Sequence, residues 1–398
     1  MKEKKTVVLG VSGGVAAYKA LEIVSMLKKL DIDVHVIMTE SATHFINPLS
    51  FQSLSQNAVI DDMFKEPKTF EIQHISLAKK ADVFLVAPAT ANIIGKVACG
   101  IADDMLSTTI MATKAPVIFA PAMNTNMYEN AIVQRNINTL KVLGYSFVEP
   151  ASGRLACGDV GTGKLADVDD IMEHIEMLLC DKKDLSGMKV LITAGPNRED
   201  IDPVRYITNR SSGKMGYALA KAARNRGAEV TLVSGPVSIK KPYGIKVVDI
   251  YSSEDMYNAV SEHFEECDAL ISAAAVADYR PMQISTSKIK KTEGDMSIPL
   301  MRNKDIIKEM GMRKKHQILV GFAAETDNLL ENAKSKIQNK NLDMIVANDV
   351  KAPDAGFQYD TNTARIISRS GNILDLPNMS KKQMSDIILD CIVEIKKR

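Results

Sequence analysis

The sequence predicts an α/β protein of two three-layer units in series, because the same strand-to-glycine pattern begins twice along the chain. Short β-branched runs at 7–9 and 190–192 each lead into small residues and a glycine-containing turn. The chain has 398 residues, which exceeds the roughly 150 residues of a typical single domain. We therefore expect two domains, at residues 1–182 and 186–398.

The first unit alternates short apolar runs with helical patterns, which is typical of a doubly wound, parallel sheet. Its expected strands are 6–11, 34–38, 83–87, 116–120 and 145–148. Ligands bind beyond the carboxyl ends of the strands in such sheets. The residues at these ends are mostly small, hydroxylated or amidic, which suits phosphate binding by backbone N–H groups: Ser12, Gly13, Gly14, Thr39, Pro88, Ala89, Thr90, Asn92 and Asn124.

The first turn, Gly10-x-x-Gly13-Gly14, differs from the G-x-G-x-x-G pattern of a dinucleotide site. No acidic residue ends the second strand to hold a ribose either. A tight strand-to-helix turn would explain the glycines equally well. Four polar strand ends within one unit favour a mononucleotide such as FMN over NAD.

Residues 149–166 have the composition of a long, glycine-rich surface loop of the kind that often covers an active site. The loop contains Gly158-x-x-x-x-Gly163-Lys164, but Leu165 replaces the serine or threonine of a P-loop and no buried strand precedes it. The loop also carries Cys157. This thiol is either incidental or chemically active, and His74, which opens an apolar helix, leaves the same alternatives open.

The second unit repeats the alternation, with strands expected at 189–193, 229–233, 269–273, 318–322 and 344–347 and a polar, β-rich finish at 364–376. The final helix, 381–396, has an amphipathic stripe that indicates closure over the sheet. Segment 208–214 opens a helix whose N-terminus could hold an anion. The lysine run at 288–291 is either a solvated turn or, near a nucleotide, a cationic group that neutralises triphosphate charge.

Charge and cysteine content exclude several classes of protein. The 50 lysine and arginine residues nearly cancel the 49 aspartate and glutamate residues, so no overall field attracts nucleic acid or an anionic membrane. No apolar run reaches the roughly 18 residues of a membrane helix. The five cysteines lack C-x-x-C spacing, which indicates a reducing cytoplasm without a disulfide framework or a structural zinc site.

Three motifs of the first unit resemble those of the flavin-binding cysteine decarboxylases that make 4'-phosphopantetheine. They lie at 10–19, at 121–127, where the P-x-M-N-x-x-M signature stands, and at 153–158. The resemblance implies a flavodoxin-like fold with FMN as cofactor. It also implies catalytic roles for His74, Asn124 and Cys157.

The chemistry of this family explains why such residues are needed. Direct loss of CO2 from an acylated cysteine would leave an unstabilised carbanion, whereas a flavin accepts a hydride from the β-carbon and leaves a thioaldehyde that delocalises the charge. The resemblance makes His74 the base near the substrate thiol and carboxyl. It makes Asn124 the group that holds the substrate carboxylate and amide, and Cys157 the acid that protonates carbon as the enethiol is reduced.

The second unit resembles phosphopantothenate–cysteine ligase in the segments 193–196, 208–213, 275–278 and 288–291. Over essentially the whole chain, the sequence is similar to the bacterial bifunctional family that combines this ligase with the decarboxylase in coenzyme A synthesis. The family activates the pantothenate carboxylate with CTP, and cysteine's amine then attacks the acyl-cytidylate. The resemblance implies a Rossmann-like ligase domain, Mg2+ or Mn2+ as the metal ion, and a large homo-oligomer, with a dodecamer among the assemblies to test.

The ligase resemblance also assigns residues. Asn209 holds the acyl-cytidylate, and Lys288 acts on the phosphates. Nucleotide or substrate contacts are implied for Ser272, Ala273, Ala274, Asp278, Asn303, Lys304, Asp305, Ile306, Phe322, Lys336 and Lys340. The chain departs from the family pattern at Tyr128, where tryptophan is common, and at Lys304, where proline is frequent.

Two rival functions deserve a test. A different flavin decarboxylase that acts on cysteine-ended peptides would leave the second unit unexplained. A flavoprotein regulatory subunit could keep the fold without the chemistry, although the joint presence of His74, Asn124 and Cys157 counts against it. Release of CO2 from phosphopantothenoylcysteine distinguishes these alternatives.

Overall fold

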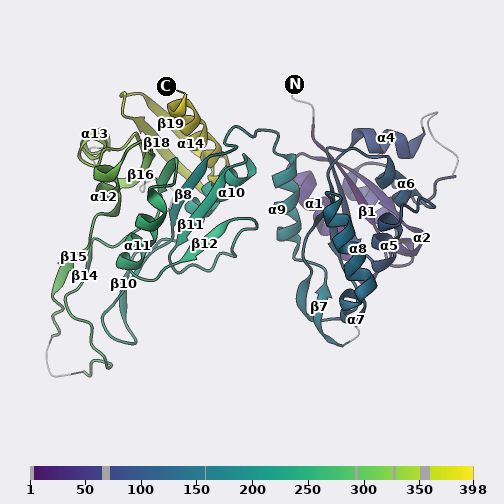
Figure 1. Ribbon diagram of the computed structural model, residues 1–398, viewed down its shortest axis with the longest axis horizontal. Coiled ribbons are helices and arrows are strands. Elements are labelled where there is room, and N and C mark those ends of the chain that lie inside the picture. The colour runs from purple at the N-terminus through teal and green to yellow at the C-terminus, as the bar shows by residue number, and fades with distance from the viewer. Residues whose placement is uncertain are drawn as a thin grey trace. The chain divides into compact units, whose positions relative to one another are not determined.

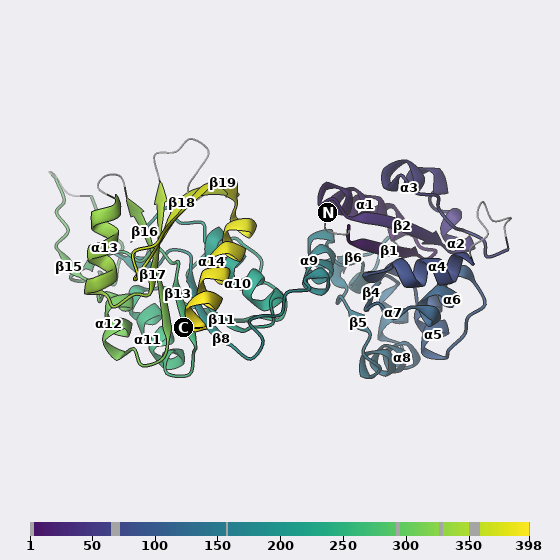
Figure 2. The same cartoon turned by 90° about the horizontal axis from the view of Figure 1, so that it is seen from above.

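The computed structural model describes residues 4–64, 72–156, 158–291, 295–325, 329–349 and 359–397 (Figures 1 and 2). Its internal contacts divide the chain into two compact units, Met1–Asp181 and Lys182–Arg398. Each unit has helices on both faces of a central sheet. The predicted α/β class with two three-layer units is therefore confirmed. Within the described residues, no helix is both long and apolar enough to cross a lipid bilayer.

The sheet of the first unit is fully parallel, with the strand order β2-β1-β3-β4-β5. This is the flavodoxin order, in which the strand sequence reverses direction between β1 and β3. The strands lie close to the predicted ranges: β1 (Thr6–Val11), β2 (Asp33–Met38), β3 (Val83–Ala89), β4 (Val117–Pro121) and β5 (Ser146–Phe147).

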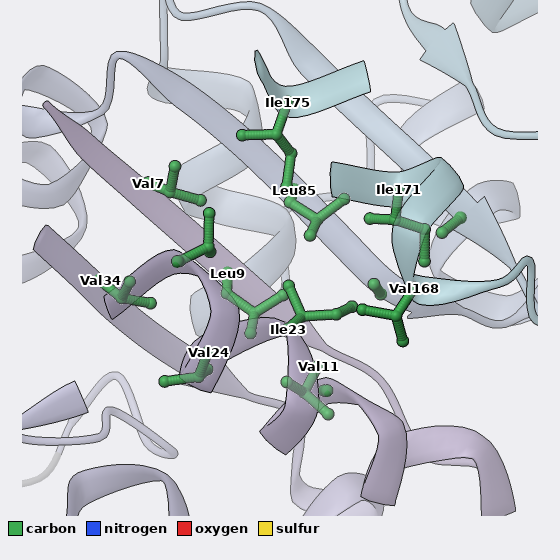
Figure 3. Packing of buried hydrophobic residues seen from close by; sticks show 14 of the residues in the cluster. Val7, Leu9, Val11, Ile23, Val24, Val34, Leu85, Val168, Ile171 and Ile175 are labelled. Atoms are coloured by element: carbon green, nitrogen blue, oxygen red, sulfur yellow. The ribbon is translucent and has the colours of Figure 1, made fainter. Parts of the chain in front are cut away.

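Alternate residues of β1 enter two different hydrophobic clusters, as expected for a strand buried on both faces. Val7 and Leu9 pack against α1 and α9 (Figure 3). Val8 packs with residues on the other face of the sheet. The helices of this unit are η1 (Val15–Tyr18), α1 (Lys19–Lys29), α2 (Glu40–Thr43), α3 (Pro48–Ser55), α4 (Gln73–Lys80), α5 (Ala91–Ala98), α6 (Met105–Ala112), α7 (Thr125–Glu129), α8 (Ala131–Val142) and α9 (Val168–Leu179).

The predicted loop at 149–166 is wrong in part, because two short antiparallel strands form within it. These strands are β6 (Ala151–Arg154) and β7 (Val160–Lys164). Glycines interrupt both strands, and neither has the apolar alternation that identifies a strand in a sequence. Beyond β6, Leu155 N–H donates to the Asp159 carbonyl at 2.8 Å, which joins the two sides of the hairpin.

The second unit has an eight-stranded sheet in the order β12-β11-β8-β13-β16-β17-β18-β19. Its first six strands are parallel in the Rossmann order 3-2-1-4-5-6, and β18 and β19 complete the sheet as antiparallel strands. The strands are β8 (Lys189–Ala194), β11 (Glu229–Ser234), β12 (Lys246–Asp249), β13 (Ala269–Ser272), β16 (Ile318–Glu325), β17 (Met344–Asp349), β18 (Thr361–Ser368) and β19 (Ile373–Ser380).

Helices cover both faces of this sheet. Ile192 of β8 packs with α10 and α14, and Leu191 packs with α11, α12 and α13 on the opposite face. The expected closing helix is confirmed as α14. The helices are α10 (Lys214–Asn225), α11 (Ser253–Phe264), α12 (Ile306–Arg313), α13 (Leu329–Asn339) and α14 (Lys381–Lys396).

Two small ladders lie outside the main sheet of this unit and have no counterpart among the predicted strands. The first pairs β9 (Arg198–Asp200) with β10 (Tyr206–Thr208), and the second pairs β14 (Tyr279–Pro281) with β15 (Leu300–Arg302). Runs of three residues are too short to show a periodicity. They matter because they carry residues that surround the predicted nucleotide site.

Candidate functional site

The first turn of the N-terminal unit is tied to the end of β3 through Ser12. The buried Ser12 hydroxyl donates to the carbonyl of Pro88 at 2.7 Å and accepts from the backbone N–H of Thr90 at 3.0 Å. It also lies 3.1 Å from the Thr90 hydroxyl. These contacts hold together the β1 and β3 ends at the switch point where flavodoxin-like sheets bind their ligands. The Ser12 hydroxyl therefore joins the turn after β1 to the end of β3.

Gly13 lies against the turn that follows β2. A Cβ atom at Gly13 would be 2.4 Å from Cβ of Ser41 and 2.8 Å from its backbone carbonyl carbon. This turn begins at Thr39, whose side chain accepts from Ala42 N–H and caps the short helix α2. Only glycine allows the turns after β1 and β2 to approach this closely.

A cavity of about 670 Å3 opens beside Gly13 and Gly14. This volume lies within the range for cofactor and small-molecule sites. The turn after β4 and the β6–β7 hairpin form its other walls. The described lining residues include the cations Lys19, Arg154 and Lys164 and no carboxylate, so the cavity suits an anionic ligand. Sequence reasoning did not select these cations as site residues, although Lys19 and Arg154 lie inside the decarboxylase motifs and Lys164 ends the rejected P-loop pattern.

Asn124 lies at this cavity, but both ends of its carboxamide are already hydrogen bonded. Its Oδ1 accepts from Asn126 N–H at 2.8 Å, which caps α7, and its Nδ2 donates to Oδ2 of Asp159 at 2.9 Å. The cap fixes which end of the carboxamide points toward the hairpin. Asp159 therefore holds the donor that the predicted role of Asn124 would direct to a substrate carboxylate.

Of the other two predicted catalytic residues of this unit, His74 lies on a different element and Cys157 is not among the described residues. His74 lies on α4, which packs against α6 at the end of the unit opposite α7 in Figure 1. It is not part of the described cavity lining. Cys157 falls outside the described residues, between Ala156 and Gly158. The structure thus brings Asn124 to the predicted flavin turn and leaves His74 apart from it within one chain.

The remaining predicted flavin residues occupy varied positions around the strand ends. Thr39 lines a separate cavity of about 500 Å3 that also contains Asp61, Asp62 and Asp103. Ala89 accepts from Ala122 N–H at 3.0 Å and joins the turns after β3 and β4. Asn92 is exposed on the first turn of α5.

Tyr128 occupies a half-buried position after Asn124. It packs with the cluster on the β4 side of the sheet, and its hydroxyl donates to Glu149 at 3.0 Å. Burial, followed by the Glu149 charge, raises the pKa of Tyr128 to about 12. The ring of Tyr128 therefore packs against this cluster, and its hydroxyl stays protonated at neutral pH.

In the second unit, the strand order reverses between β8 and β13, and Asn209 lies at that switch point. Its Nδ2 donates to the carbonyl of Ala275 at 3.0 Å, and Ala275 N–H donates to Gly195 at 3.0 Å. Ala274 N–H donates to the Thr193 hydroxyl at 3.2 Å. The structure thus brings together three segments that the sequence analysis treated as one site.

Asn303 joins the same network through Ala277 and Asp278, and the network also includes Arg280 and Asn197, which the sequence analysis did not select. Its Nδ2 donates to Ala277 at 2.8 Å, and its Oδ1 accepts from Arg280 at 2.8 Å. Ala277 N–H in turn donates to the buried side chain of Asn197 at 2.7 Å. The carbonyl of the exposed residue Asp278 accepts from Asn303 N–H at 2.8 Å. Asn303 therefore fixes the backbone next to Asp278.

The predicted residues after Asn303 form a charged cluster at the start of α12. Asp305 caps the helix through Lys308 N–H at 3.2 Å and pairs with Lys340 at 2.9 Å. Lys304 pairs with Glu254 at 3.0 Å and lies 4.2 Å from the ring centroid of Tyr257. Ile306 is buried beneath this cluster. Lys336 lies on α13, and Lys340 directly follows the end of this helix.

A cavity of about 150 Å3 lies at the N-terminus of α10 and contains Ala273, Ala274 and Phe322. Sequence reasoning did not select Asn348, Asn362 and Lys381, which complete its wall. Burial lowers the pKa of Lys381 to about 8, and the charge of Lys214 adds to this effect. A lysine at the start of an amphipathic helix gives no sequence signal of burial.

The last predicted ligase residues lie at the edges of the site. Ser272 ends β13, and Lys288 is exposed in the segment that follows β14. Throughout the described part of the chain, no group of three or more His, Cys, Asp or Glu side chains is arranged to hold a metal ion. This observation leaves the metal ligands unassigned.

Comparison with known proteins covers both units. Residues 1–180 match the family described as Flavoprotein, and residues 185–395 match the family described as DNA/pantothenate metabolism flavoprotein C-terminal domain. The chain is 50% identical over 401 residues to the coenzyme A biosynthesis bifunctional protein CoaBC of Bacillus subtilis (strain 168), covering 100% of this chain and 99% of the relative. It is 45% identical to the protein of the same name from Escherichia coli (strain K12), covering 98% and 97%.

Solved structures match the units separately. The crystal structure of the C-terminal domain of the coenzyme A biosynthesis bifunctional protein CoaBC is 42% identical, with a TM-score of 0.47, covering 54% of this chain and 99% of that chain. A phosphopantothenoylcysteine (PPC) decarboxylase mutant complexed with pantothenoylaminoethenethiol is 33% identical, with a TM-score of 0.40, covering 44% and 98%. On its full-length identity to the curated relatives, the chain belongs to the CoaBC family of bifunctional coenzyme A biosynthesis proteins, with a flavoprotein domain followed by a ligase domain.

Proposed function

We propose that the C-terminal unit joins cysteine to 4'-phosphopantothenate with CTP and that the N-terminal unit decarboxylates the product to 4'-phosphopantetheine with FMN. One observation carries this proposal. Ser12 and Thr90 are hydrogen bonded at the switch point of a flavodoxin-order sheet, and Asn209 is hydrogen bonded to Ala275 at the switch point of a Rossmann-order sheet in the same chain, which supports a nucleotide site in each unit. The proposal includes the cytoplasm as the location of the protein and 1–182 and 186–398 as the two functional domains.

The cavity beside Gly13 fits the requirements of FMN and an anionic substrate. Backbone N–H groups of the turn after β1 suit the phosphate, and Lys19, Arg154 and Lys164 supply positive charge at the cavity wall. When bound, FMN supplies the electron sink that loss of CO2 from a cysteine carboxylate requires. Asn124 orients the substrate carboxylate after exchanging its bond with Asp159.

His74 and Cys157 complete the proposed decarboxylase site as proton-transfer groups. His74 would take the substrate proton, and Cys157 would return one to carbon. Because His74 is not in the described lining of the cavity at Asn124, and its helix α4 lies at the end of the unit opposite α7 in Figure 1, we propose that a second copy of the chain contributes it. This arrangement requires a homo-oligomer, for which a dodecamer is the assembly to test.

Mixing two inactive variants tests the shared site. We expect His74→Asn and Asn124→Asp proteins to lack decarboxylation when each is assembled alone. Dissociated and reassembled together, they should recover part of the parental CO2 release, because some sites would combine an intact His74 with an intact Asn124. No recovery in a verified mixed oligomer would contradict the shared site.

The proposed ligase reaction uses the crevice between β8 and β13. Asn209 faces the backbone of Ala275 at this switch point, where its carboxamide can hold the acyl-cytidylate. Lys288 would neutralise the phosphates as pyrophosphate leaves. Mg2+ or Mn2+ would be held mainly by the triphosphate oxygens and water, as is usual when a protein offers no dedicated cage.

Separate expression of the two units tests the assignment of each reaction to its domain. Residues 1–182 should remain yellow and release CO2 from added phosphopantothenoylcysteine. Residues 186–398 should form phosphopantothenoylcysteine with CTP and carry no flavin colour. Ligation by the N-terminal fragment, or its loss from a folded C-terminal fragment, would contradict the division.

A further inference from the structure

An ion pair between Asp202 and Arg205, in the turn between β9 and β10, contacts the lysine run at 288–291 through Ile289. Asp202 has a fully buried side chain, and the side chain of its partner Arg205 is 40% exposed. Asp202 Oδ1 accepts from the backbone N–H groups of Val204 and Arg205, both at 2.9 Å. Its Oδ2 accepts from Nε of Arg205 at 3.0 Å and also from Nη2. These four hydrogen bonds all lie within the β9–β10 turn, and they hold the Asp202 carboxylate in one orientation.

The same pair binds both backbone groups of Ile289. Ile289 N–H donates to Asp202 Oδ2 at 3.1 Å, and Nη2 of Arg205 donates to the Ile289 carbonyl at 3.0 Å. These contacts join positions more than 80 residues apart, in a region where the β9–β10 turn and the segment after β14 run side by side (Figure 1). A second attachment lies nearby, because Ser285 N–H donates to Ile201 at 3.0 Å.

These contacts restrict the direction of Lys288. The peptide group that links Lys288 to Ile289 is planar and contains the Cα of Lys288. The hydrogen bond from the Ile289 N–H therefore also restricts the position of the Lys288 Cα. The Lys288 side chain itself is exposed, as are those of Lys290 and Lys291. Three like charges within four residues repel one another, and a free turn would spread them. The ion pair holds the backbone of Ile289 and so opposes the separation of the three lysines. It leaves their ammonium groups exposed and able to bind a phosphate.

Stability alone gives a weak reason for such a pair. Burying a carboxylate costs solvation energy, and apolar residues of similar volume often stabilise a fold as well or better. The Arg205 guanidinium holds the pKa of the Asp202 carboxyl well below its usual range, so the pair stays charged at working pH. An ion pair differs from an apolar contact in that it binds a neighbouring N–H and C=O in a fixed geometry.

We propose that Asp202, with Arg205, is a positioning residue for Lys288: it holds the backbone at Ile289 so that the Lys288 ammonium meets the leaving phosphate oxygens of a nucleoside triphosphate. This inference rests on the role proposed above for Lys288 in the ligase reaction. Neither Asp202 nor the pair touches the substrate in this account. Their effect passes entirely through the lysine.

The test combines a double-mutant cycle with a structural readout in the full-length chain. Asp202→Asn keeps the side-chain size but replaces one carboxylate oxygen by a donor, which would face Arg205 or backbone N–H groups. The matched control is Asp255→Asn, which changes another ligase carboxylate that accepts a backbone N–H, from Ser252 at 2.9 Å. CTP-dependent pyrophosphate release is measured for the parent, Asp202→Asn, Asp255→Asn, Lys288→Gln and the Asp202→Asn/Lys288→Gln double variant.

We expect Asp202→Asn to lower kcat for pyrophosphate release by about tenfold to a hundredfold, with a smaller change for Asp255→Asn. The double variant should be no slower than Lys288→Gln, because Asp202 has nothing to position once the lysine is lost. Losses that multiply in the double variant would overturn the proposal. If the parent releases no pyrophosphate from CTP with phosphopantothenate, the ligase assignment itself fails, which is a separate outcome.

Trypsin supplies the readout that does not depend on activity. Without ligands, cleavage after Lys288, Lys290 or Lys291 should accelerate roughly tenfold in Asp202→Asn and stay at the parental rate in Asp255→Asn. Thermal unfolding of the two variants confirms that both remain folded at the digestion temperature. Parental cleavage rates in Asp202→Asn would show that the turn does not depend on the ion pair and would overturn the proposal.

Discussion

Gly13→Ala tests whether the close approach of the turns after β1 and β2 builds the flavin site. The added Cβ would lie 2.4 Å from Cβ of Ser41, 2.8 Å from its carbonyl carbon and 3.0 Å from its carbonyl oxygen. Ordinary carbon–carbon contacts lie near 3.5–4.0 Å, so the turns must separate by about 1 Å. Two of the three contacts are backbone atoms, and rotation of the Ser41 side chain cannot relieve them.

The size of the effect follows from this geometry. Overpacking of this kind costs about 1–3 kcal/mol, and a flavin that needs both turns in place must restore the strained arrangement when it binds. Since about 1.4 kcal/mol corresponds to tenfold in affinity, the flavin Kd should rise by about tenfold to a hundredfold. Thermal stability of the unit should fall as well.

Flavin content per chain, read from the visible absorbance of the purified protein, gives the first measurement. Titration of the stripped protein with FMN gives Kd, and thermal unfolding reports stability. Gly95→Ala is the matched control, because its Cβ would meet only Asn136 Nδ2 at 3.7 Å within the interior of α5. This control should keep its flavin and gain up to about 1 kcal/mol of stability. Parental flavin affinity and stability in Gly13→Ala would refute the reasoning.

Three further predictions concern individual side chains. Cys157→Ser should bleach its flavin once under anaerobic conditions, release about one CO2 per flavin and accumulate the enethiol, because a hydroxyl is a far weaker acid than a thiol of pKa ~8.5; parental turnover would remove its role. His74→Asn should leave the flavin oxidised on adding substrate, and bleaching would contradict its role as the activating base. Lys381 has a lowered pKa of about 8, so the folded chain binds the lysine proton more weakly than the unfolded chain does. The free energy of unfolding of the parent, relative to that of Lys381→Met, should therefore increase as pH rises above about 8. The increase should be at most about 1.4 kcal/mol per pH unit. Parallel thermal unfolding at pH 7 and pH 9.5 checks this difference, and equal pH dependence of the two proteins would contradict it.

The fold could be predicted where strands are buried on both faces. The apolar runs of β1 and β8 mark the start of each unit, and the alternation with helices predicts parallel sheets. The β6–β7 hairpin and the three-residue strands β9, β10, β14 and β15 could not be predicted. Their side chains are partly exposed and their runs are too short to show a period.

The location of the site could be predicted from the sequence, but most of its individual contacts could not. Parallel strands end at one edge of the sheet, so Ser12 and Thr90 were expected to lie together, and they share a hydrogen bond. The hydrogen bond from Asn124 to Asp159 could not be anticipated, because it depends on the fold of the hairpin. The burial of Lys381 is also invisible in the sequence, since its surroundings combine residues from several separate segments, including 211–216, 273–275 and Asn348.

The residue roles have a different origin from the fold. Motif resemblance led to His74, Asn124, Cys157, Asn209 and Lys288, and composition alone left His74 and Cys157 open. Within one chain, Asn124 lines the cavity, whereas His74 lies on α4 and is not in the described lining. This separation of His74 from Asn124 leads to a testable prediction, namely that two copies of the chain form one decarboxylase site.

The most direct test of the central claim supplies purified full-length protein with 4'-phosphopantothenate, cysteine, CTP and Mg2+ and follows all products together. The account predicts one pyrophosphate and one CO2 for each 4'-phosphopantetheine formed, without an external reductant. Omission of CTP should abolish both pyrophosphate and CO2. Pyrophosphate release with accumulation of phosphopantothenoylcysteine and no CO2, from protein that carries its flavin, would contradict the claim that one chain performs both reactions.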